Sequence, residues 1–127
     1  MTKAIEKIVF SEMLALFTEH QAPKIVGEVN DFQVKLVKFL GTFVWHSHEK
    51  EDELFIVLKG RLKFQFPDRV IELNPGEGVI APRGIPHCPI AEEEVHVLLI
   101  EPKTTVNAGS AAGPKTRQAE WLLGGRT

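Results

Sequence analysis

The stretch of residues 45–53 holds residue types that bind metal ions. His46 and His48 are two positions apart, and Glu53 follows five residues later. In a β-strand, residues i and i+2 point to the same face, so the two imidazoles would enter one shared space. Imidazole together with carboxylate suits a first-row divalent metal. The stretch therefore predicts a metal site, and we expect the rest of the chain to build a container for it.

Glu53 is one of four acidic residues in this stretch. Glu49, Glu51 and Asp52 precede it, and a solvated charged loop would account for all four. The apolar run that follows Glu53, and its spacing to Gly60, favour Glu53 as the carboxylate that turns inward. Asp52 is the alternative ligand.

Length and charge exclude several classes of protein. The chain has 127 residues, which suits one domain over residues 1–127, with a barrel at about 24–101 and a tail at 102–127. The formal net charge is −2 and no Lys/Arg stripe is visible, which argues against a nucleic-acid partner. No apolar stretch of about 18 residues is present, so no membrane span is expected.

The single cysteine and the N-terminal sequence favour a cytoplasmic protein. Cys88 has no second cysteine to pair with, as is usual in a reducing compartment. The first residues lack the long apolar core of a secretory signal. Because Cys88 directly follows His87, it would point the opposite way in a strand, and we interpret it as a small buried side chain.

Short β-strands dominate the middle of the chain. Residues 32–40 alternate apolar and polar side chains, which indicates a half-buried strand, and residues 42–48 continue the β pattern. Residues 53–59 are apolar without alternation, which is typical of a strand covered on both faces. Further strands are expected at 24–29, 62–66, 70–73, 78–81, 87–90 and 95–100, with a turn at 91–94.

This pattern predicts an all-β fold, either a sandwich, a barrel or a jelly roll. A short helical turn is expected near residues 11–17, with Ser11 as its N-cap. Residues 102–120 read as an extended or partly disordered tail, which is followed by an apolar anchor at residues 121–123. This tail would lie either on its own barrel or over a neighbouring subunit.

Two longer motifs contain the candidate ligands. The first begins at Gly41, includes the two histidines and the glutamate, and ends at Gly60. The second begins at Gly76, contains a Pro-x-Gly, and ends at His87. They resemble the two motifs of the cupin superfamily. The chain is similar to small single-domain cupins of the cupin-2, mannose-6-phosphate isomerase-like type, whose activity is unassigned.

The resemblance implies a cupin-type β-barrel (a double-stranded β-helix or jelly roll) and four metal ligands, His46, His48, Glu53 and His87. Such a set leaves two positions of an octahedron for water, substrate or dioxygen, and it accepts Mn, Fe, Ni, Co or Zn. Two departures are visible. The spacer between Gly41 and the first histidine is one residue shorter than the common pattern, and Ala91 replaces the usual asparagine, which is not a ligand.

Strand parity suggests which side chains line a pocket beside the metal. If His46 faces inward, Val44 does too and Trp45 faces away; if Glu53 faces inward, so does Phe55. The loop arginine before His87 would either hold an anionic group or remain solvated, and His96 would either enter the barrel or face solvent. The candidate lining residues are Val44, Phe55, Phe64, Arg83 and His96.

Two functions fit these residues. One is a metal-dependent oxygenase, isomerase or lyase acting on a small polar molecule; the other is a non-enzymatic small-molecule binder or sensor. A purely structural or storage role would leave the ligands without a use. A second inward polar residue, such as His96 or Gln65, would favour chemistry, whereas an all-apolar lining would favour binding.

The outer face of the strand at 53–59 predicts a partner. Leu54, Ile56 and Leu58 are all apolar, and a small barrel cannot bury both faces by itself. A second sheet, the N-terminal segment or another subunit must cover this face. We therefore expect a homodimer.

Overall fold

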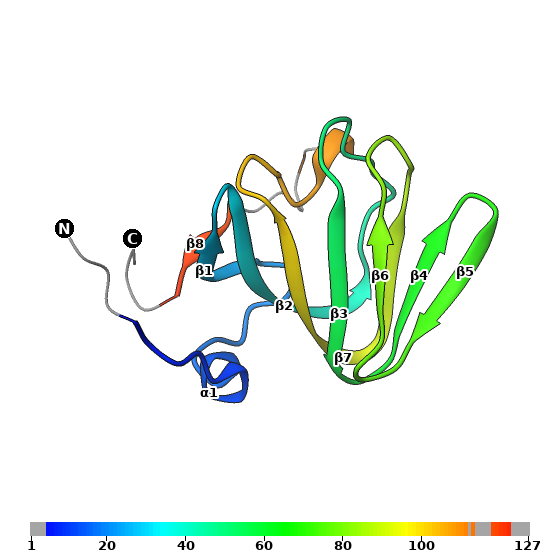
Figure 1. The fold of residues 1–127 in the computed structure, drawn as a ribbon. Coiled ribbons are helices and arrows are strands. Elements are labelled where there is room, and N and C mark those ends of the chain that lie inside the picture. Colours follow the sequence, from blue (N-terminus) through cyan, green and yellow to red (C-terminus); the bar gives the residue numbers. More distant parts are fainter. Residues whose placement is uncertain (1–4, 112, 114–117, 123–127) are drawn as a thin grey trace.

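The computed structural model describes residues 5–111, 113 and 118–122, and these form an all-β jelly roll, as predicted (Figure 1). Among the described residues, no helix is long and apolar enough to span a membrane. The elements are α1 (Phe10–Leu14), β1 (Lys24–Val29), β2 (Phe32–Thr42), β3 (Glu53–Lys59), β4 (Leu62–Phe66), β5 (Arg69–Leu73), β6 (Gly78–Ala81), β7 (Cys88–Pro102), the 3₁₀ helix η1 (Gly109–Ala111) and β8 (Glu120–Trp121).

Strand β7 is the centre of the topology. It pairs with β2, β3 and β4, and the sheet order is β5-β4-β7-β2-β1-β8, with β3 joining β7 to β6. Figure 1 shows β7, coloured yellow to gold, between β2 and β3. The described strands do not close into a continuous ring of hydrogen bonds. Because one strand borders three others, its register sets the position of most residues around the site.

The inward faces of these strands form the main core. Phe55 packs edge-on against Phe64, with ring centroids 4.7 Å apart, and Cys88 is buried as interpreted from the sequence. The buried members of this cluster are Val37, Phe39, Phe55, Val57, Leu62, Phe64, Leu73, Ala81, Ala91, Val95, Val97 and Leu99. The core thus lies directly beneath the candidate ligands.

The turn expected at residues 91–94 is wrong, because these residues belong to β7. Phe39 pairs with Val95 and Gly41 with Ala91, so three residues on β7 oppose one on β2. Pairing with β2 continues on both sides, and the acidic residues bulge out to solvent instead of turning the chain. Gly41 has a φ of +84°, which helps its strand follow the irregularity.

The strand expected at residues 42–48 is interrupted. β2 ends at Thr42, and pairing with the second motif resumes only at a single bridge between His46 and His87. The Phe43 N–H donates to the carbonyl of Pro89, and the His46 N–H donates to that of His87. Between these two hydrogen bonds the chain advances three residues, from Phe43 to His46, while its partner advances only two, from Pro89 to His87. Side chains before and after this irregularity therefore no longer alternate in step, and the inward positions shift by one residue.

The alternation in β2 is correct, but the strand is buried on both faces. Lys35 is only 1% exposed and Gln33 is also buried, whereas Phe32 is 45% exposed. The polar face of the pattern is the one that looks into the barrel. The reason is a buried partner for Lys35, described below.

The two ends of the chain cover part of the outer face. α1 begins at Phe10, so Ser11 is not its N-cap, and Val9 at that position offers no side-chain cap. Leu14 and Phe17 pack with Leu58 and other apolar side chains of the sheet. The N-terminal segment therefore covers part of the outer apolar face, which is one of the three alternatives predicted from the sequence.

The C-terminal tail packs on its own barrel. β8 pairs in parallel with β1, with Glu120 opposite Lys24 and Trp121 opposite Ile25. Leu122 joins the cluster beneath α1, while Leu123 lies outside the described residues.

Two glycines with the same backbone conformation test how tightly the hairpins are packed. Gly60 and Gly76 both have a φ of +86°, but a Cβ on Gly60 would lie 2.8 Å from the carbonyl oxygen of Glu94, whereas one on Gly76 meets nothing within 4 Å. Both alanine substitutions carry the left-handed strain of about 1–2 kcal/mol. We expect Gly60→Ala to lower the free energy of unfolding by about 1–3 kcal/mol more than Gly76→Ala, because of the clash. Denaturant unfolding measures both, and equal losses would contradict this packing.

Candidate metal centre

Four side chains from separate parts of the chain meet at one end of the barrel. His46 and His48 follow β2, Glu53 begins β3, and His87 directly precedes β7. All four are at most 5% exposed. The ring centroid of His46 lies 4.9 Å from that of His48 and 4.4 Å from that of His87. The single bridge between His46 and His87 brings the two motifs together.

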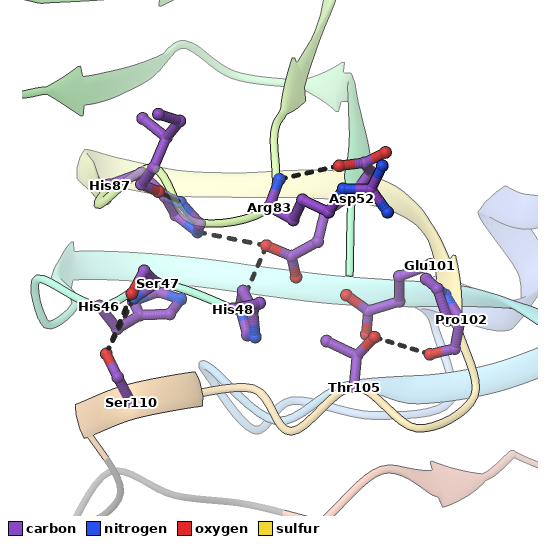
Figure 2. Close-up of polar contacts among 12 residues, drawn as sticks. His46, Ser47, His48, Asp52, Arg83, His87, Glu101, Pro102, Thr105 and Ser110 are labelled. Atoms are coloured by element: carbon purple, nitrogen blue, oxygen red, sulfur yellow. Dashed lines mark hydrogen bonds and ion pairs between the residues drawn. The ribbon is translucent and has the colours of Figure 1, made fainter. Parts of the chain in front are cut away.

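The donor atoms converge on a common point. His48 Nε2 and His87 Nε2 lie 3.1 Å and 3.2 Å from the same Glu53 oxygen, Oε1. In Figure 2, dashed lines run from the labelled His48 and His87 rings to this oxygen. One donor atom from each of the four residues lies within 4.8 Å of the others. Although they are close to one another, His48 Nε2, His87 Nε2 and Glu53 Oε1 are buried and form no hydrogen bond of acceptable geometry among the described residues. Unpartnered buried polar atoms are costly, and a divalent cation between them would satisfy all three.

Backbone carbonyls fix the orientation of two of the rings. His46 Nδ1 donates a hydrogen bond to the carbonyl of Val44 at 2.8 Å, and His87 Nδ1 donates to that of Ile85 at 3.1 Å. A carbonyl oxygen can only accept, so Nδ1 carries the proton in both rings. Each Nε2 lone pair is therefore free to bind a metal, which is the usual arrangement behind a metal-bound histidine.

Electrostatics give the site the protonation states that a metal requires. Burial lowers the pKa of His46 to about 4, although its hydrogen bond to the Val44 carbonyl acts in the opposite direction. Burial alone would raise the pKa of Glu53, but the contacts with His48 and His87 outweigh it and hold that pKa well below its usual range. At neutral pH the site thus presents a neutral imidazole at His46 and an ionised carboxylate.

The other acidic residues of the stretch lie outside this cluster. Asp52 is exposed, and its carboxylate accepts a hydrogen bond from the backbone N–H of Arg83 at 2.8 Å (Figure 2). Glu51 accepts a hydrogen bond from the hydroxyl of Thr104. Glu49 is exposed. Of the four acidic residues, the structure brings Glu53 to the histidines.

The family model of the cupin domain (Cupin_2) matches residues 36–101, about half of the chain, and this range includes all four candidate ligands. This chain is a cupin. Its fold and its His-His-Glu-His cluster agree with that assignment.

The chain is also similar to several known proteins, one of which is described as a cupin. A solved cupin-2 domain containing protein from Shewanella frigidimarina is 45% identical, with a TM-score of 0.74 over 75% of this chain and 93% of that one. A solved protein from Neisseria meningitidis is 31% identical, with a TM-score of 0.70 over 76% and 99%. The uncharacterized protein YdbB of Bacillus subtilis is 40% identical over 70 residues, 54% of this chain, and the match spans 62% of the length of YdbB.

A small cavity of about 30 Å³ adjoins the candidate metal ligands of this cupin. Most of its wall is apolar, and His46, Glu53, Gln21 and Asn107 contribute polar groups. The lining residues are Gln21, Pro23, Val37, Phe39, Phe43, His46, Glu53, Phe55, Pro89, Leu99 and Asn107.

Among the five side chains suggested as pocket lining, Phe55 is part of this wall. Val44 is half-buried outside it, because the parity change after β2 turns Phe43 inward instead. Phe64 is buried in the core, with its ring 5.4 Å from that of His87. The last two lie elsewhere: Arg83 is exposed, and His96 faces another part of the surface, where it pairs with a glutamate.

Sequence reasoning missed several residues at the site. Phe43 was hidden by the irregular chain after β2, and Gln21 and Asn107 come from segments outside the barrel strands. Glu101 is also buried here, close enough to Glu53 for the Glu53 carboxyl group to raise the pKa of Glu101. Its position could have been found by extending the alternation of Val97 and Leu99 along β7.

Residues 103–111, here called the strap, cross over the candidate metal ligands. The Ser110 N–H donates to the carbonyl of Ser47, and the Ser47 N–H donates to the hydroxyl of Ser110. Figure 2 shows the Ser110 side chain against Ser47. The amide of Asn107 donates to the carbonyl of Gln21, which joins the strap to the N-terminal segment beside the cavity. A Cβ on Gly109 would meet the Ser47 carbonyl and come within 2.9 Å of the His48 ring.

The close packing of Gly109 against Ser47 and His48 leads to a prediction about the rate at which a bound metal would dissociate. Gly109→Ala should push the strap away from His48, since a clash costing about 1–3 kcal/mol raises the open population by at least about fivefold. Exchange of the Ser110 amide hydrogen, and transfer of bound Co²⁺ to excess EDTA, should both accelerate. Gly76→Ala is the matched control, because it has a left-handed backbone and open space around its Cβ. Equal rates in the two variants would show that the strap does not close over the site.

Proposed function

We propose that this cupin binds one divalent metal ion through His46, His48, Glu53 and His87, and that it is a metal-dependent enzyme acting on a small molecule. The observation that supports the site is the set of three buried atoms, on His48, Glu53 and His87, that face one another without hydrogen bonds. Mn, Fe, Ni, Co and Zn all accept three imidazoles and one carboxylate.

The residues of this chain would prepare a dry, ordered site. A bound divalent cation supplies a Lewis acid or a site for dioxygen. The carbonyls of Val44 and Ile85 hold two of the histidines in the tautomer that presents Nε2. Aromatic side chains at Phe43 and Phe55 line the neighbouring cavity and limit the room for water in it.

The size of the cavity restricts the substrate. A volume of about 30 Å³ has room for about two water molecules. A dioxygen-sized molecule matches this volume, whereas a sugar or an organic acid is larger than the cavity. A small polar substrate, or a part of one, is therefore favoured.

One observation favours an enzyme and another favours a binder. His96 and Gln65 do not line the cavity, but Glu101 supplies a second inward polar group beside Glu53, which supports chemistry. The mainly apolar wall supports the second candidate, a non-enzymatic small-molecule binder or sensor. A screen of small acids and sugars with the metal-loaded protein separates the two, since a binder shows saturable binding without turnover.

Metal analysis of purified variants tests the site. His48→Ala should lose a ligand, so the stoichiometric metal of the wild-type protein should fall to a small fraction. His20→Ala is the control, because His20 pairs with Glu94 on the surface, away from the cluster. Inductively coupled plasma mass spectrometry measures the metal in both. Substoichiometric metal that is the same in all three proteins would refute the site.

We also propose that this cupin forms a homodimer through the outer face of its sheet. Leu54 pairs with Ile80 on β6 and with Ile100 on β7, and Ile100 pairs with Val34 on β2. These four apolar residues form one row across four strands, and Ile80 is 60% exposed. Val34, at one end of this row, and the neighbouring Leu58 pack against the cluster that contains Leu14 and Phe17 of the N-terminal segment, whereas the other three residues of the row are outside that cluster. A cytoplasmic location and the absence of a nucleic-acid partner stay predictions from the sequence.

A charge in this row should separate the subunits. Because Ile80 is exposed, Ile80→Arg should leave the fold of the monomer intact and disrupt an apolar interface. Size-exclusion chromatography with light scattering should show a dimer for the wild type and a monomer for the variant. A wild-type monomer at micromolar concentration would refute the dimer.

A further inference from the structure

Lys35 and Glu101 form an ion pair inside the barrel. Each side chain is 1% exposed, and the Lys35 ammonium donates a hydrogen bond to Oε2 of Glu101. Lys35 lies on β2 opposite Leu99 of β7, which is two residues from Glu101 and shares its inward face. The pair is therefore part of the interior, level with the apolar core.

Strand register brings Glu101 beside the candidate ligand Glu53. Leu54 pairs with Ile100, so the next step along this antiparallel ladder sets Glu53 opposite Glu101. Both glutamates are buried on the inward side of their strands. Side chains directly opposite on one face have Cβ atoms about 4.5–5.5 Å apart. The two carboxyl groups are neighbours, and each affects the pKa of the other.

One oxygen of Glu101 has no well-formed hydrogen bond. Oε2 accepts from Lys35, whereas Oε1 is buried and has no hydrogen-bond partner of good geometry among the described residues. Burial and the neighbouring Glu53 raise the pKa of Glu101 well above its usual value, against the effect of Lys35. A buried oxygen without a hydrogen bond lowers the stability of the folded protein.

Stability alone does not explain such a pair. Replacing a buried ion pair by apolar residues of similar volume is often neutral or stabilising, because desolvation offsets much of the attraction. The surrounding core already supplies apolar neighbours such as Val37 and Leu99. The position of Glu101 next to a metal ligand offers a reason for the cost.

We propose that Glu101, anchored by Lys35, is a positioning residue for Glu53. It holds the Glu53 carboxylate toward the histidines and so increases the affinity of the site for a divalent metal. This inference rests on the proposed metal site. Groups that hold metal ligands in place typically account for 10–100-fold in metal affinity.

Two double variants separate positioning from packing. Lys35→Met/Glu101→Leu removes the ion pair and leaves an apolar side chain beside Glu53. Lys35→Met/Glu101→Gln has a side chain of similar size at position 101, but its amide can still donate a hydrogen bond to the Glu53 carboxylate. Both variants avoid an uncompensated buried lysine. Co²⁺ is the probe, with its dissociation constant measured by chelator competition and its visible spectrum reporting the ligand geometry.

We expect the Leu variant to bind Co²⁺ about 10–100-fold more weakly with an altered spectrum, and the Gln variant to remain within about threefold of wild type. Equal affinities for wild type and the Leu variant would overturn the positioning role while leaving the metal site intact. A wild-type protein that binds no Co²⁺ would overturn the site and this inference together. If the double variants do not fold, Glu101→Asp serves instead: it keeps the carboxyl group but shortens its reach, so weaker binding supports the role and unchanged binding overturns it.

Discussion

The structure depends on the burial of one carboxylate. Glu53 is 3% exposed at the start of β3, and a carboxylate in such a place is tolerated only when charges or hydrogen bonds compensate for lost water. His48 and His87 approach it from two separate segments, and a divalent cation among them would complete the compensation. A shift of β3 by one residue against β7 would turn Glu53 outward. The register between β3 and β7 therefore determines whether the carboxylate can reach the histidines.

Local patterns in the sequence predicted much of the barrel. The strands expected at residues 53–59, 62–66 and 78–81 have the same bounds in the structure, because each is a short run of strand-forming residues bounded by turn residues. His46 and His48 stood out by spacing. His87 was implied by resemblance to the cupin motifs, since its nearness to the other ligands depends on a bridge between distant segments.

Features that depend on a partner strand could not be read locally. Alternation in β2 separates two faces but does not say which is inside, and Lys35 is inward because Glu101 lies 66 positions away on a strand that pairs with β2. The bulges after Gly41 and within β7 likewise arise from unequal lengths on paired strands. A run of glutamates looks like a turn from its composition, and only continued pairing on both sides makes it part of a strand.

The strap has a consequence for how such proteins diverge. The cupin match ends at residue 101 and the strap begins at residue 103, so the segment above the candidate ligands lies outside the matched barrel. A barrel of this kind can keep its ligands and its core while the segment after β7 is lengthened, shortened or replaced. Under the proposed function, selectivity for the entering molecule and the identity of the metal would evolve as separate traits, because they would depend on different stretches of chain.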